Sequence, residues 1–168
     1  LDGAAGAMVY GTAPAAPVRL STFATDAFVL AGAVGGTTAF VLDREMGLLA
    51  LDLAKKSEPK LISRWMPLGA HRLTVRDGVC YLGSSGVHVY DLTDPDNPME
   101  TYCYEGGGTL KTLIDGDKAY VAINNRNGPF MVFDVSDPLH PEVLDSSSGG
   151  RRFRLLPIAR WRSEATGL

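Results

Sequence analysis

Four polar residues could act together as a catalytic group: Asp26, His71, Arg72 and Lys111. An Asp near a His can transfer protons, and a neighbouring Arg or Lys can stabilise an anion, as a hydrolase, lyase or isomerase requires. Each of the four lies at or just before a short apolar segment that is predicted to be a strand. The simpler alternative, that each side chain completes a turn or faces solvent, is favoured by the residue types alone.

The remaining reactive residues carry no signature of a metal or a cofactor. The three histidines, His71, His88 and His140, lie in different parts of the chain, and no pair has the spacing of zinc ligands. The triplet Gly106-Gly107-Gly108 lacks the Lys and the helix that follow a phosphate-binding loop. The sequence therefore predicts no metal and no cofactor.

One polar loop is a candidate for contact with a partner. Asn124-Asn125-Arg126-Asn127 belong to the longest insertion between two predicted strands. Polar loops held by a rigid scaffold often carry binding residues, although a plain solvated loop is the alternative here. We expect a protein or a small-molecule ligand as the partner.

The elements that would position these residues belong to a repeat of about forty residues. Four marker prolines are separated by 42, 39 and 43 residues, and in the last three copies an Asp lies seven residues before the proline, after a short apolar run. The first copy has Tyr10 in place of that Asp. The prolines are Pro17, Pro59, Pro98 and Pro141, and the acids are Asp52, Asp91 and Asp134.

Each unit contains four short strand signals and no helical period, which is typical of a β-propeller blade. The first two strands of a unit are predicted to be joined by turns at Gly32, Asp77-Gly78 and Asp115-Gly116. The segment from the Asp to the proline is predicted to be a stiff corner, since an Asp side chain can accept from a backbone amide two residues on and proline fixes φ. The predicted fold is all-β, with blades of four antiparallel strands.

The corner motif resembles a known family. Residues 130–141 have the pattern strand-Asp-Val-Ser-Asp-Pro-x-x-Pro, and a strand with Ala119-Tyr120-Val121 precedes it. The pattern is similar to the LVIVD repeat, and the similarity covers about residues 7–148. That family is known from bacterial and archaeal proteins, many of them secreted or at the cell surface, and its members share no single activity. The resemblance implies a β-propeller and an extracellular or cell-surface location, with the cytoplasm as the alternative.

The repeats occupy residues 1–148, in units near 1–17, 18–59, 60–98 and 99–141, and residues 149–168 form a tail. A propeller blade covers its neighbour, so an array of about four units leaves apolar faces that something must close. We expect a small ring, a homo-oligomer or a second chain that completes the propeller. The tail, with five arginines interleaved with apolar residues, could supply a closing strand.

Composition narrows the class of protein. With 45% hydrophobic and 21% charged residues the chain is an ordinary folded domain, and no apolar run is long enough to span a membrane. An acidic body argues against nucleic acid as a partner. Cys80 and Cys103 lie in apolar strand-like segments, which favours buried thiols over a single disulfide. We therefore expect a non-catalytic ligand- or protein-binding propeller scaffold, outside the cytoplasm, with an enzyme of the central funnel as the alternative.

Overall fold

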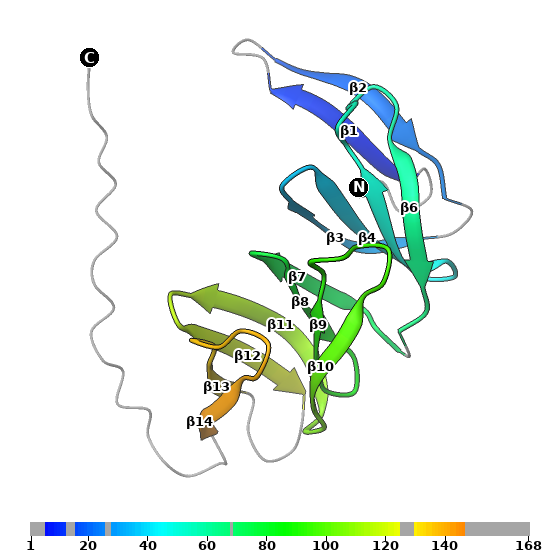
Figure 1. Ribbon diagram of the computed structural model, residues 1–168. Helices are drawn as coiled ribbons and strands as arrows, with labels where there is room; N and C mark the ends of the chain where they lie inside the picture. Colours follow the sequence, from blue (N-terminus) through cyan, green and yellow to red (C-terminus); the bar gives the residue numbers. More distant parts are fainter. Residues whose placement is uncertain (1–5, 13–15, 26–27, 68, 125–129, 147–168) are drawn as a thin grey trace, which may run out of the picture.

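The structure, a computed structural model, describes residues 6–12, 16–25, 28–67, 69–124 and 130–146. In this part of the chain, fourteen strands form four antiparallel sheets, and there is no helix (Figure 1). Consequently no described helix is long and apolar enough to cross a membrane. The prediction of an all-β chain is confirmed. The tail, residues 149–168, lies outside the described residues.

The sheets follow one another along the chain, and within each sheet the strands are paired in sequence order. The first sheet has two strands, β1 (Ala7–Thr12) and β2 (Pro17–Phe23). Three four-stranded sheets follow, here called the first, second and third blades. The first blade contains β3 (Val29–Gly35), β4 (Thr38–Asp43), β5 (Gly47–Asp52) and β6 (Lys60–Trp65). The second contains β7 (Arg72–Arg76), β8 (Val79–Gly83), β9 (Val87–Asp91) and β10 (Met99–Tyr104). The third contains β11 (Gly108–Asp115), β12 (Lys118–Asn124), β13 (Phe130–Asp134) and β14 (Glu142–Ser146).

Turn residues with a positive φ join the first two strands of the blades. Asp77 and Gly78 have φ values of 50° and 77°, in agreement with the predicted Asp-Gly turn. The predicted turn at Gly32 is wrong, because Gly32 lies inside β3 and pairs with Val41. Gly36, with φ 61°, supplies the turn instead. Only the second of these two glycines adopts the left-handed backbone that a tight hairpin requires.

The corners between the third and fourth strands have the predicted mechanism. The Oδ1 atoms of Asp52, Asp91 and Asp134 accept the backbone amides two residues further on, at 2.7, 2.8 and 2.8 Å. The strand after each marker proline then pairs with the strand before it, so that each blade includes a corner. The repeated Asp thus fixes the same reversal of the chain three times.

The blades pack face to face, and each interface is apolar. Between the first and second blades, Phe40, Leu42 and Leu48 meet Cys80 and Leu82. Between the second and third blades, Phe133 is buried with its ring edge-on to Tyr102 and Tyr104, at centroid distances of 6.4 and 5.6 Å. The second interface is lined by Val79, Tyr81, Val87, Val89, Ala119, Val121, Ile123, Met131 and Phe133.

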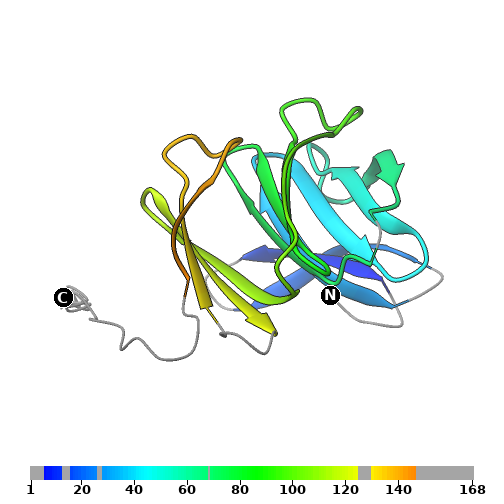
Figure 2. The same cartoon turned by 90° about the horizontal axis from the view of Figure 1, so that it is seen from below.

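The first strands of the blades lie next to one another. Strand β3 contacts β7, and β7 contacts β11, whereas the fourth strands are outermost in their sheets. Figure 2 shows the blades as separate sheets standing one beside the next. This is the arrangement of propeller blades, whose first strands line the central axis. Any site of a propeller funnel would therefore involve β3, β7 and β11.

The corner acids predict how stability depends on pH. The amide of Thr93 holds the pKa of Asp91 below its usual range, and the amide of Ser136 does the same for Asp134. Because these pKa values are lowered by folding, their stabilisation is present above the ordinary Asp pKa and is lost as the pH falls through the lowered values. We expect the variant Asp91→Asn/Asp134→Asn to lose less stability than the wild type between pH 7 and about pH 3, since Asn still accepts the amide but does not titrate.

The measurement is the urea midpoint at both pH values. Asp96→Asn/Asp145→Asn is the control, because neither carboxylate accepts a hydrogen bond from the described residues. An acid-induced loss that is equal in all three proteins would contradict this account of the corners.

Candidate functional site

The side chain of His71, one of the four candidate catalytic residues, lies against backbone carbonyls. Its Nδ1 lies 3.1 Å from the carbonyl oxygen of Gly69, and its Nε2 lies 2.9 Å from that of Thr109 on β11. Both ring nitrogens therefore face backbone carbonyl oxygens of the protein rather than a second reactive side chain. In this structure His71 joins the second blade to the third.

Arg72 belongs to a row of side chains that connect β7 to β11. Its Nε donates to the carbonyl of Leu110 at 3.0 Å, and the Thr74 hydroxyl donates to the carbonyl of Thr112 at 3.1 Å. Arg76 extends the row, because its Nη1 donates to the carbonyl of Gly116 at 2.9 Å. Alternate residues of a strand face the same side, so one strand makes three successive bonds to the next blade. These contacts tie the second blade to the third.

The other predicted site residues are not brought into a catalytic group by the described structure. Lys111 lies on β11, exposed, at the position that Arg72 has on β7. Asp26 lies outside the described residues, as do Asn125, Arg126 and Asn127. Asn124 is exposed at the end of β12, where it remains a candidate for partner contact.

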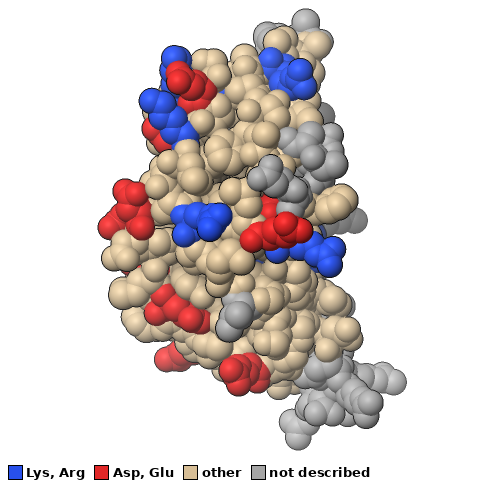
Figure 3. Space-filling model, turned by 90° about the vertical axis from the view of Figure 1, so that its right-hand side faces the viewer, with Lys and Arg blue, Asp and Glu red and all other residues tan. Residues whose placement is uncertain are grey.

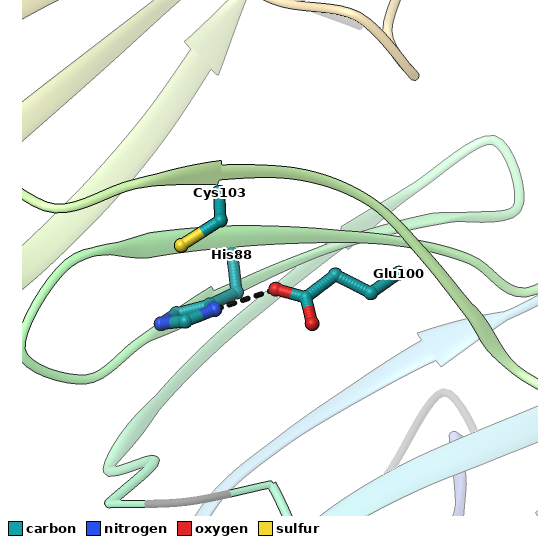
Figure 4. Close-up of side chains that lie close together, drawn as sticks. All are labelled: His88, Glu100 and Cys103. Carbon is teal, nitrogen blue, oxygen red and sulfur yellow. Dashed lines mark hydrogen bonds and ion pairs between the residues drawn. The ribbon is translucent and has the colours of Figure 1, made fainter.

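A different group of reactive side chains lies on β9 and β10. His88, Glu100 and Cys103 each place one potential ligand atom within 4.8 Å of the other two (Figure 4). Cys103 pairs directly with His88 across the two strands. Glu100, three residues before Cys103, would normally face the opposite side, but the register shifts between Glu100 and Tyr102. This bulge brings both side chains to the face that His88 occupies.

Hydrogen bonds hold the carboxylate of Glu100 in place. Its Oε1 lies 2.7 Å from Nδ1 of His88, and its Oε2 accepts from the Tyr90 hydroxyl at 3.4 Å. Burial, followed by the charge of Glu100, raises the pKa of Tyr90 to about 12, so this hydroxyl stays a donor at neutral pH. The side chains of His88 and Glu100 are 24% and 41% exposed, which leaves the pair accessible to solvent.

A pocket of about 250 Å³, here called the His88 pocket, adjoins this group. Ser84 also lines it, and the buried Oγ of Ser84 has no hydrogen-bond partner among the described residues. A buried hydroxyl without a partner is costly in a folded protein. The His88 pocket is lined by Met66, Pro67, Ala70, Leu82, Ser84, His88, Tyr90 and Glu100.

The expectation of two buried thiols is wrong for Cys103. Cys80 is fully buried in the interface between the first and second blades, and burial raises the pKa of its thiol. Cys103 is exposed, because β10 is the outermost strand of its sheet, and both cysteines are free. Partial desolvation, followed by the charges of Glu100 and Glu105, raises the pKa of the Cys103 thiol. The disulfide alternative is not realised.

Sequence spacing could not have revealed this group. His88 and Glu100 are twelve residues apart on different strands, and the bulge that brings Cys103 to the same face has no proline or glycine to mark it. The period-two pattern of a regular strand would have separated Glu100 from Cys103.

Charge on the face shown in Figure 3 is mixed. Lys and Arg alternate there with Asp and Glu, and uncharged surface separates them. On this face no charge of one sign forms a large patch.

No family model and no curated protein match the chain. Among solved structures, the N-terminal domain of Nup159 is similar with a TM-score of 0.55 and 16% identity over 87% of this chain. A complex in which S. cerevisiae Dbp5 is bound to Nup159, Gle1, IP6 and ADP gives a TM-score of 0.53 and 16% identity over 79% of this chain. At such identity the likeness shows the fold alone.

These comparisons support an all-β chain with propeller-type blades. The chain spans 38% and 34% of the two matched chains. The propeller implied by the corner motif is confirmed, while no family model supports the LVIVD family itself.

The row of bonds from β7 to β11 gives a test of its structural role. Thr74→Val removes the hydroxyl that donates to the Thr112 carbonyl but keeps the branched shape, so we expect the free energy of unfolding to fall by about 1 kcal/mol. Urea denaturation measures it, with Thr22→Val on the exposed side of β2 as the control. A Thr74→Val variant as stable as the wild type would show that this row does not join the blades.

Proposed function

We propose that this chain is a non-catalytic, protein-binding β-propeller scaffold, which binds its partner through the uncovered face of the third blade. The observation that carries the proposal is that this face is apolar and that no described sheet packs on it. The proposal goes beyond the fold, which the comparisons support, to a specific surface.

The open face is defined by residues whose register places them on one side of β11, β12 and β13. Leu113 pairs with Tyr120, and Tyr120 pairs with Val132, forming one row across the sheet. Ala122 and Phe130 form a second row, and the rings of Tyr120 and Phe130 have centroids 5.9 Å apart. Leu113 is 59% exposed. The open face therefore has two mainly apolar rows that water reaches, with Lys111 at the end of the second row and a charged row of Asp115, Lys118 and Asp134 beside the first.

The same positions are buried in the two preceding blades. Phe40 and Tyr81 occupy the register position of Tyr120, and both are only 3% exposed because the next blade covers them. Ala50 and Val89, at the position of Val132, are fully buried for the same reason. The third blade has kept apolar residues where a fourth sheet would cover them.

A polar residue of β11 supports the same conclusion. Lys111 has the register position of Arg72, which donates to a carbonyl of the following blade. Lys111 places a cation at the corresponding position of the third blade, on the side of the open face. It is suited to donate to a backbone carbonyl of whatever sheet covers the open face.

The occupant that we propose is a second copy of the chain. Every interface within the chain joins one face of a sheet to the opposite face of the next, which is a head-to-tail relation. At the other end, the two-stranded sheet exposes Tyr10, Val18 and Leu20, at 50%, 57% and 41%. The first sheet of a second copy can therefore continue the stack, and head-to-tail contacts of this kind can close into a ring.

For the enzyme alternative, the described residues show His71 and Arg72 bonded to backbone carbonyls and Lys111 exposed on β11, while Asp26 lies outside them. We therefore base the proposed function on the open face.

Sedimentation velocity over a range of concentrations tests the proposal. We expect the wild type to self-associate, and we expect Leu113→Glu to weaken the association at least tenfold, because a charge would be buried in an apolar interface. Met99→Glu is the matched control, since Met99 is 61% exposed but lies on β10 of the second blade. A monomer at every concentration, or an equal effect of Met99→Glu, would overturn the proposal.

A further inference from the structure

A metal site can be argued from the group on β9 and β10, independently of the open face. We propose that His88, Glu100 and Cys103 bind a zinc ion, and that the fourth coordination position is left for water or for a donor atom of a ligand in the His88 pocket.

The donor set favours zinc among common divalent cations. The three residues offer one imidazole nitrogen, one carboxylate oxygen and one sulfur. Zinc accepts all three donors in tetrahedral sites, whereas calcium and magnesium require oxygen ligands. Three protein ligands with water or another ligand in the fourth position is a coordination that protein zinc sites adopt. On binding, Cys103 is a thiolate, and its proton is released to solvent.

The distances require only a small adjustment. Ligand atoms in a tetrahedral zinc site lie about 3.3–3.8 Å apart, given bonds of about 2.0–2.3 Å. The present atoms lie within 4.8 Å of one another, and Nδ1 of His88 lies 2.7 Å from Oε1 of Glu100. For zinc to bind, the Cys103 sulfur must approach the other two ligand atoms, and Oε1 of Glu100 must move slightly away from Nδ1 of His88. Rotation of side chains on neighbouring strands permits both movements. Figure 4 shows the three side chains on the same side of the two strands.

The surroundings supply the support that metal ligands usually have. The Tyr90 hydroxyl donates to Oε2 of Glu100, which orients the carboxylate and leaves Oε1 on the side of His88. The unpartnered Oγ of Ser84, which is 3% exposed, lines the same pocket. A ligand that fills this pocket would offer the buried hydroxyl a partner.

The chain contains a natural comparison for the site. His140 Nδ1 lies 3.0 Å from Oδ2 of Asp137, so the histidine–carboxylate pair is repeated at the corner of the third blade. That pair has no thiol beside it, and its side chains are 68% and 64% exposed. If a histidine–carboxylate pair were enough to attract zinc, both places would bind it equally.

Isothermal titration of the tag-free, full chain with Zn²⁺ is the first test. We expect one strong equivalent of Zn²⁺ in the wild type, an affinity reduced about tenfold or more in His88→Ala and Cys103→Ala, and no change in His140→Ala. Binding that survives the His88→Ala and Cys103→Ala substitutions, or that is lost equally in His140→Ala, would overturn the proposal.

A second test uses only the wild type, so its result does not depend on whether a variant of the site folds. An aromatic disulfide reagent added to the native wild type should modify one thiol, that of Cys103, since Cys80 is buried. We expect an equivalent of Zn²⁺ to slow this reaction at least tenfold and a chelator to restore the rate. A rate unaffected by Zn²⁺ would contradict coordination by Cys103, whatever the titration shows.

Discussion

The described four-stranded sheets have apolar residues on both faces, and burying them requires another sheet to cover each face. The second blade satisfies this requirement on both sides, because its Cys80 and Leu82 meet the first blade and its Val89 meets the third. Burial of such a side chain stabilises the fold by roughly 1.5–3 kcal/mol. An uncovered face therefore lowers the stability of the whole array. The third blade is the place where the covering sheet is missing from the described structure.

The same constraint explains what the polar residues near the propeller axis do in the described structure. Strands β7 and β11 lie side by side, and the backbone carbonyls of Thr109, Leu110 and Thr112 on β11 lie within hydrogen-bond reach of side chains of the second blade. His71, Arg72 and Thr74 satisfy those carbonyls. The reactive group is instead found on β9 and β10, the outer strands, where a bulge rather than the central axis determines which side chains meet.

The fold could be predicted from the sequence because it depends on local chemistry that is repeated. Asp52, Asp91 and Asp134 mark the corners, and each makes the bond expected of it. The group formed by His88 and Cys103 could not be predicted, because strand register and a bulge bring its members together. Gly32 was misplaced in a turn because several small residues surround it, and only the backbone conformation shows that Gly36 turns the chain.

The central claim is that the open face of the third blade is a surface covered by another copy of the chain. Hydroxyl-radical footprinting at low and high protein concentration measures this directly, since it reports the solvent exposure of each side chain. The account predicts that Leu113, Tyr120 and Val132 become protected as concentration rises, while Met99 on the second blade keeps its reactivity. Unchanged reactivity of Leu113 and Tyr120, or equal protection of Met99, would contradict it.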